Sequence, residues 1–216
     1  MQFLDPKELT HITLRHGEGA QLHEPSLLQF FQTDFPRLSH LRVGAPFASP
    51  LSPSHEVCTQ VLSAFLAKTD TLFSLSLAED MFLAPLSLSS RLFSTSSLPF
   101  IQELRCTPCQ LRTLSDVPLH SLKQLRTLAI AKSFLPDFQE DDRNVYPIIR
   151  SVVAHGRLET VKRVGYFSIG FRTGPIARFQ DYGHGEVMAA LGDLCPKATV
   201  VEGTFQALDR TKACTI

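Results

Sequence analysis

The stretch Ile101-Gln-Glu-Leu104-Arg-Cys106-Thr-Pro-Cys109-Gln-Leu111 sets the interpretation of the whole chain. Apolar residues occupy its first, fourth, sixth and eleventh positions, and a cysteine occupies the ninth. This spacing is typical of one unit in a protein built from short structural repeats. Because a single unit of this size cannot bury its apolar side chains alone, the pattern predicts further copies in the sequence.

The spacing of positions one, four and six recurs six times elsewhere in the chain. With the opening stretch, 19 of the 21 such positions are apolar, whereas a hydrophobic content of 44% would give about nine by chance. The further copies are Leu9, Ile12 and Leu14; Leu38, Leu41 and Val43; Leu72, Leu75 and Leu77; Leu125, Leu128 and Ile130; Leu158, Val161 and Arg163; and Ala198, Val201 and Gly203.

Prolines support the registers of three copies. Pro36, Pro99 and Pro196 each lie two residues before the first core position, where proline blocks a preceding helix and favours an extended chain. The sixth copy is ambiguous, since Val161, Val164 and Tyr166 fit the same spacing three residues further on. The sequence leaves both registers open.

The copies resemble irregular leucine-rich repeats. The lead-ins that begin at Phe35 (Phe-Pro-x-Leu-x-x-Leu) and Cys195 (Cys-Pro-x-Ala), with long variable intervals, are similar to the repeat arrays of F-box proteins, particularly fungal ones. The resemblance implies a short strand and a turn in each copy, with Leu104 and Cys106 facing a core and Glu103 and Arg105 facing out. It also implies a solenoid with strands on its concave side and helices or loops on its outer side.

In such an array, positions three and five of each copy face the concave side and contact partners. Here these positions are His11 and Thr13, His40 and Arg42, Ser74 and Ser76, Glu103 and Arg105, Thr127 and Ala129, Thr160 and Lys162, and Val200 and Glu202. We expect the partner-binding residues to be His11, His40, Arg42, Glu103, Arg105 and Lys162.

The segments between copies predict helices. Residues 54–68 offer an N-cap serine and apolar residues at helical spacing, and residues 24–31, 144–154 and 186–194 are similar. Alternating strands and helices predict an α/β fold with parallel strands and about seven degenerate repeats, in one domain over residues 1–216. Residues 165–185 contain five glycines and predict either an inserted hairpin or a degenerate repeat.

Composition narrows the classes of function. Lys plus Arg and Asp plus Glu both total 21, so the net charge of zero argues against duplex binding by phosphate neutralisation. Five cysteines form no disulfide framework and the N-terminus lacks signal-peptide features, so we expect an intracellular location in the cytoplasm or nucleus. The apolar runs are too short to span a bilayer.

Three motifs raise metal or catalytic chemistry. Cys106-Thr-Pro-Cys109 is a C-x-x-C, but the repeat pattern explains both cysteines and no second C-x-x-C completes a zinc site. His16-Gly-Glu18 and His184-Gly-Glu186 could form a metal or acid–base site, but histidine, glycine and glutamate are also ordinary loop residues, and we prefer that interpretation. We therefore expect no metal, no cofactor and no catalytic residue. The enzymatic alternative is a serine hydrolase that uses Ser168 with Asp181 and His184, although the segment lacks the first glycine of G-x-S-x-G.

A second alternative is weak RNA or anion binding through residues 157–178. The basic residues there are Arg157, Lys162, Arg163, Arg172 and Arg178, opposed only by Glu159. A solvated face, or a complement to the acidic residues 137–142, explains them more simply.

The preferred function is a non-enzymatic protein–protein interaction module. As the resemblance implies, it would be the substrate-recognition array of an F-box-type ubiquitin ligase receptor. No F-box fits before the first copy at Leu9, so we expect adaptor binding only if a longer parent chain carries that segment.

Overall fold

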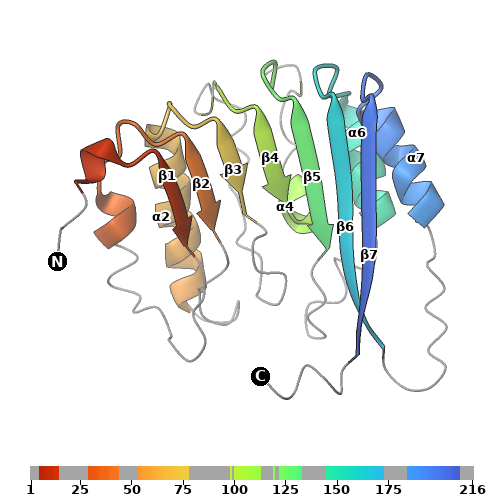
Figure 1. Cartoon of the computed structure of the whole chain (residues 1–216), viewed down its shortest axis with the longest axis horizontal. Coiled ribbons are helices and arrows are strands. Elements are labelled where there is room, and N and C mark those ends of the chain that lie inside the picture. The colour runs from red at the N-terminus through yellow and green to blue at the C-terminus, as the bar shows by residue number, and fades with distance from the viewer. Residues whose placement is uncertain are drawn as a thin grey trace.

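The chain forms an α/β fold around a single sheet of seven parallel strands (Figure 1). The computed structural model describes residues 5–14, 29–43, 53–77, 98, 100–112, 119, 122–132, 145–172 and 184–209. Within them the strands lie side by side in chain order: β1 (His11–Leu14), β2 (His40–Val43), β3 (Ser74–Ser76), β4 (Glu103–Cys106), β5 (Thr127–Lys132), β6 (Arg163–Arg172) and β7 (Val200–Asp209). The predicted parallel sheet is confirmed.

The described helices α2 (Pro53–Lys68), α4 (Pro108–Arg112), α6 (Val145–His155) and α7 (His184–Leu194) lie on one face of the sheet (Figure 1). A 3₁₀ helix, η1 (Pro6–Glu8), precedes β1. The helices predicted over residues 54–68, 144–154 and 186–194 are confirmed to within two residues at each end. Of the helix predicted over residues 24–31, residues 29–31 are helical and the remainder lies outside the described residues.

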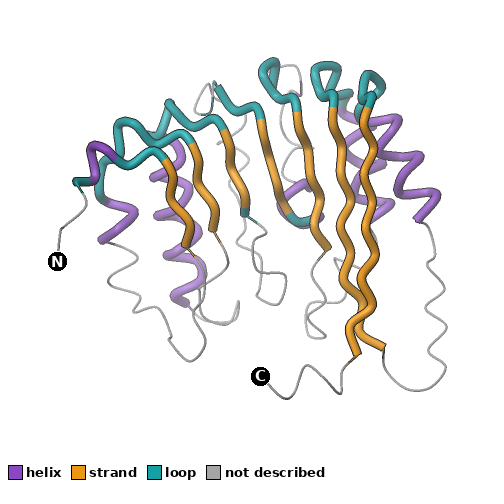
Figure 2. The backbone as a smooth tube through the Cα atoms, in the orientation of Figure 1, coloured by secondary structure: helices purple, strands orange, loops and turns teal. Residues whose placement is uncertain are grey.

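The same turn precedes every strand, and Figure 2 shows these turns along the edge of the sheet where the strands begin. In all seven copies the amide of the first core residue donates to the carbonyl three residues earlier, at 3.0 to 3.4 Å. Pro36 and Pro196 occupy the second position of this turn, which suits the fixed backbone angle of proline. The residue whose carbonyl accepts this hydrogen bond is buried in six of the copies. These residues are Phe35, Thr69, Leu98, Leu122, Leu158 and Cys195.

A repeated hydrogen bond joins neighbouring strands just after the turn. At Gln102, one carbonyl accepts from the amides of Arg126 and Thr127 at 2.8 and 2.9 Å. The carbonyls of Thr10, Ser39, Phe73, Arg126 and Lys162 accept in the same way from the strand that follows. The copies therefore share backbone geometry as well as apolar spacing.

One row of side chains crosses the sheet on the helix-covered side. Position four of successive strands is in register, and its exposed fraction is 8% or less at Ile12, Leu41, Leu75, Leu104, Leu128 and Val164. The seventh member, Val201, is 52% exposed because β7 is the last strand of the described sheet. The hydrophobic core thus lies between the sheet and its helices.

The structure decides the register of the sixth copy. Thr127 pairs with Arg163 and Leu128 with Val164, so the core positions are Val161, Val164 and Tyr166. Leu158 does not occupy the first core position. It is the buried residue at the start of the turn, and its carbonyl accepts the hydrogen bond from Val161.

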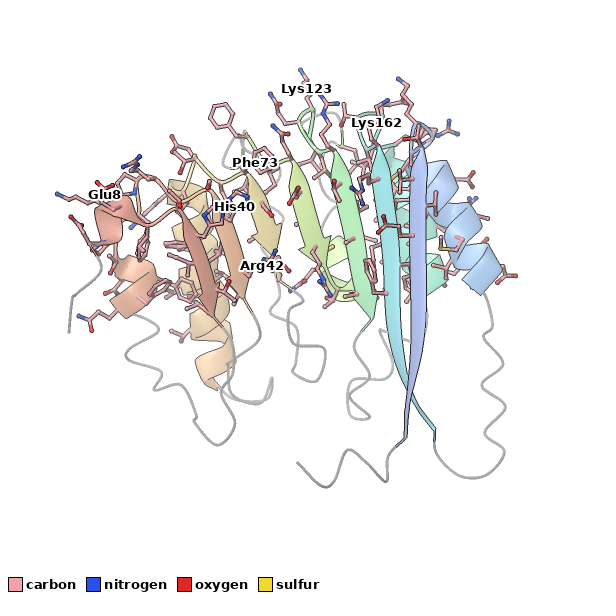
Figure 3. All side chains as sticks on the ribbon, viewed as in Figure 1. Glu8, His40, Arg42, Phe73, Lys123 and Lys162 are labelled. Atoms are coloured by element: carbon pink, nitrogen blue, oxygen red, sulfur yellow. The ribbon has the colours of Figure 1, made fainter. Side chains whose placement is uncertain are left out.

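The expected placement of Thr160 and Lys162 at the outward-facing positions three and five of the sixth copy was therefore wrong. Lys162 corresponds to Gln102 and Arg126, at the edge where strands begin, and Figure 3 shows it along that edge, which also carries Lys123. The residues that replace this pair on the face are Arg163 and Gly165.

The glycine-rich segment continues the sixth strand. Residues 165–172 belong to β6 and pair with residues 202–209 of β7, so no inserted hairpin forms over this part. Residues 173–183 of the candidate insertion lie outside the described residues. β6 and β7 are consequently ten residues long each, against three to six for β1 to β5.

Candidate functional site

The face of the sheet opposite the helices, called the open face below, is covered by no described helix or strand (Figure 1). Two rows of side chains cross it because strand residues alternate between faces. The first row is His11, His40, Ser74, Glu103, Thr127, Arg163 and Val200, and the second is Thr13, Arg42, Ser76, Arg105, Ala129, Gly165 and Glu202. Of the six expected contact residues, all but Lys162 are in these rows.

Two histidines stack at the β1 end of the open face. The rings of His11 and His40 are 4.0 Å apart at their centroids and within 11° of parallel. Each ring nitrogen Nδ1 lies within 2.9 Å of the hydroxyl of the preceding residue, Thr10 or Ser39. His40 also contacts Phe73, with ring centroids 5.6 Å apart (Figure 3).

The environment of His40 favours its neutral form. Burial lowers the pKa of His40 most, the neighbouring His11 and Arg42 lower it further, and only Glu103 opposes them. A neutral imidazole can donate one hydrogen bond and accept another. The pair therefore offers a partner a flat surface with hydrogen-bonding edges, and a hydroxyl residue before each histidine was the sequence signal for it.

Arg42, Ser76 and Arg105 lie in register on three adjacent strands. Arg42 is exposed and Arg105 is half-buried, whereas Ser76 is only 6% exposed. Two polar atoms here, Oγ of Ser76 and Nε of Arg105, are buried without a hydrogen-bond partner. Buried polar atoms in folded proteins are nearly always paired, so this part of the open face has hydrogen-bonding capacity to spare.

Phe167 holds the Arg105 side chain in place. The guanidinium carbon of Arg105 lies 5.5 Å from the centroid of the Phe167 ring, a cation–π contact that spans two strands. The ring folds back over Gly165, where an added Cβ would lie 2.7 Å from Phe167 Cε2. Sequence reasoning missed this contact because it depends on the register of β6.

The far end of the open face carries an ion pair. Arg163 on β6 and Glu202 on β7 form a salt bridge of 2.8 Å. Both side chains are about half exposed, so the pair adds little stability. The salt bridge nevertheless pairs Arg163 with an opposite charge. Among the described residues, the other two arginines of the open face, Arg42 and Arg105, form no ion pair.

The first cysteine of the C-x-x-C motif, Cys106, is a buried core residue. Cys106 is 1% exposed, and burial raises the pKa of its thiol to about 12, so it stays protonated at neutral pH. Cys109 lies in α4, and its side chain is outside the described part. Within the described residues, no three His, Cys, Asp or Glu side chains gather as a metal site.

A capping box joins Thr107, which follows Cys106, to Gln110, which follows Cys109. The Gln110 side chain accepts from the Thr107 amide at 2.9 Å, and the Thr107 hydroxyl accepts from the Gln110 amide at 3.3 Å. Both residues are buried, so the motif starts the short helix α4 without leaving those amides unpaired. The Thr-Pro-x-Gln sequence was the signal for it.

Ser168 lies inside β6, in register with Lys132 and Phe205. A nucleophile elbow needs a sharp strand-to-helix turn, and the backbone at Ser168 is continuous strand. His184 begins α7, whereas Asp181, His16 and Glu18 lie outside the described residues.

The basic residues of 157–178 do not converge where the structure describes them. Arg163 is paired with Glu202 on the open face, whereas Lys162 lies at the edge where strands begin. Arg157 is exposed, the side chain of Arg172 is outside the described part, and so is all of Arg178.

No family model matches the chain, and neither the curated proteins nor the solved structures contain a match to it. Every helix in the described residues is too short or too polar to cross a bilayer. The geometry of the open face is therefore the observation on which a function can be argued.

Proposed function

We propose that this chain is a leucine-rich-repeat-type solenoid that works as a non-enzymatic, intracellular protein–protein interaction module, with the open face as its concave binding surface. The observation that carries the proposal is a repeated unit: the turn and the strand occur in all seven copies, and the same shared-carbonyl hydrogen bond joins each of the six successive pairs. Stacked units of this kind present side chains on parallel strands at fixed spacing, which suits the binding of an extended protein surface.

The chemistry of the open face supports a protein partner. It combines stacked imidazoles, arginines, a glutamate and small hydroxyl residues, and it carries charges of both signs. Arginine and aromatic side chains are the residue types that most often dominate the energy of protein interfaces. A phosphate-binding surface would carry a larger excess of basic residues.

The family extension of the proposal is a substrate receptor of an F-box-type ubiquitin ligase. Its support is the likeness of the lead-in sequences at Phe35 and Cys195 to F-box repeat arrays, together with the buried positions that these two residues occupy in the turns. In this extension the open face binds the substrate, and an F-box in a longer parent chain binds the ligase adaptor.

The test is affinity capture from native cell extract with two matched triple variants. The open-face variant combines His40→Ala, Arg42→Ala and Glu103→Ala. The control variant combines Lys68→Ala, Tyr146→Ala and Glu186→Ala, which are exposed on the helices and remove a similar set of one cation, one anion and one ring.

The proposal expects a partner that the native chain and the control variant recover and the open-face variant loses. Equal recovery by all three proteins would place binding elsewhere and refute the role of the open face. Recovery of ubiquitin-ligase subunits with the longer parent chain supports the F-box extension, and their absence removes the extension alone.

A further inference from the structure

We propose that the open face recognises an acidic segment of its protein partner, with carboxylates paired to Arg42 and Arg105 on either side of Ser76. This inference rests on the proposed function and names the chemistry of the partner. The three residues are in register on β2, β3 and β4, so strand spacing places the Cα atoms of the two arginines about 9.5 Å apart.

The first argument is unmet hydrogen-bonding capacity. Nε of Arg105 and Oγ of Ser76 are buried without partners, although they belong to paired residues of neighbouring strands. An arginine Nε–H can only donate, so its missing partner must be an acceptor. A carboxylate oxygen is an acceptor whose charge also complements the guanidinium.

The second argument is that Arg105 is positioned before any ligand arrives. Its guanidinium lies over the Phe167 ring of β6, and the next two residues of its own row toward β6 are the small Ala129 and Gly165. These small residues leave room for the long side chain to extend across the sheet. A side chain that is already ordered loses less entropy on binding, so the contact favours Arg105 as an anchor.

The third argument selects carboxylates over phosphate. The Cα atoms of the two arginines are about 9.5 Å apart, and the Arg105 guanidinium extends away from Arg42 over Phe167 of β6. The two charges therefore suit two separate monoanionic groups better than one compact phosphate. Glu103 lies on the same strand and face as Arg105, and its charge would repel a dianion more strongly than a monoanion. Glu103 and Glu202 likewise disfavour a nucleic-acid backbone along this face.

The experiment is a titration of the full chain with hexaglutamate, followed through the arginine Nε–Hε signals in ¹H–¹⁵N NMR spectra. Ionic strength is held constant with KCl. The inference expects saturable shifts of the Arg42 and Arg105 signals, whereas Arg163, already paired with Glu202, and Arg126, near the edge where strands begin, serve as internal references.

Variants then assign the binding energy. Arg42→Ala and Arg105→Ala should each weaken hexaglutamate binding by at least about tenfold, since each removes a charged hydrogen bond. Ser76→Ala removes no charge and should weaken it by about twofold to tenfold. Arg126→Ala removes the same charge away from the trio and should leave the affinity unchanged, and retained dispersion of the amide spectra shows that each variant is folded.

Several outcomes would overturn the inference. These are equal shifts of all arginine signals, equal weakening by Arg126→Ala, or inorganic phosphate binding as tightly as hexaglutamate. If hexaglutamate fails to bind while the open-face variant loses its captured partner, this inference fails and the proposed function stands. If that variant keeps every partner, the proposed function itself fails.

Discussion

Arg105 illustrates how the role of one residue depends on its neighbours. From the strand pattern alone, Arg105 and Glu103 are equivalent outward residues whose removal leaves folding nearly unaltered. In the structure Glu103 is exposed, whereas Arg105 is half-buried against Phe167. The two positions therefore differ in what they contribute to stability.

Arg105→Ala is expected to lower the free energy of unfolding by about 0.5–1 kcal/mol, because it removes the cation–π contact with Phe167. Glu103→Ala should change it by less than about 0.5 kcal/mol, as at most exposed positions. Urea unfolding of both variants measures the difference. Equal effects would show that the Arg105–Phe167 contact adds no stability in solution.

His40 links the open face to pH. Its pKa in the folded chain is lower than in the unfolded chain, so the unfolded chain binds more protons as the pH falls through that range. The free energy of unfolding should therefore decrease from pH 7.5 to pH 5.5, and His40→Gln should decrease less. Urea titrations of both proteins at the two pH values test this, and identical decreases would contradict it.

At the scale of elements, the turn before each strand and the caps of the helices connect the copies. The capping box of Thr107 and Gln110 lies directly after β4 and joins it to α4 within the buried part of the molecule. A helix as short as α4 has little stability of its own, so its start must be held by such local bonds.

Removal of the capping hydroxyl tests this connection. Thr107→Val keeps the shape of the side chain but leaves the buried Gln110 amide without its acceptor, and should lower the free energy of unfolding by about 1 kcal/mol. Thr107→Ser retains the hydroxyl and should cost much less. Chemical denaturation of both variants provides the comparison, and similar losses would indicate that packing of the Thr107 methyl group dominates instead.

The register of β6 can also be tested by substitution, because it decides which of its residues are buried. Val164 is 2% exposed, whereas Lys162 is exposed. Val164→Ala should lower the free energy of unfolding by about 2 kcal/mol, since it removes two buried carbon groups and leaves a cavity. Lys162→Ala should change it by less than about 0.5 kcal/mol. Thermal or urea unfolding measures both losses. A larger loss in Lys162→Ala than in Val164→Ala would favour the other register, in which Arg163 occupies position six.

At the scale of the whole molecule, the sheet grows by addition of like units in chain order. Within the described sheet, every strand except β1 and β7 has a neighbour on each side, and the exposure of Val201 shows the consequence at the β7 edge. Stability in such an assembly should therefore depend on position along the sheet.

Hydrogen exchange can measure this dependence with matched groups. The amides of His40, Glu103, Thr127 and Val200 make the same hydrogen bond to the preceding strand, at 2.9 to 3.2 Å. We expect Glu103 and Thr127, in the middle, to exchange more slowly than His40 and Val200, near the ends. Equal protection at all four amides would show that the sheet opens only as one cooperative unit.

The sequence by itself determined the repeated strand, the parallel order of the sheet and three of its helices, because apolar spacing and helix signals are local. It also identified twelve of the fourteen residues in the two rows of the open face, including Arg42 and Glu103, since side chains alternate along every strand. What it could not predict depends on contacts between copies, such as the stacking of His11 on His40 and the placement of Phe167 over Gly165.

The register of β6 shows the physical reason most clearly. Leu158, Val161 and Val164 are all apolar at intervals of three, because the buried residue of the turn is apolar as well as the core positions. The local pattern therefore fits two registers three residues apart. Only the tertiary structure decided between them, because pairing of Leu128 with Val164 buries Val164 and brings Phe167 within reach of Arg105.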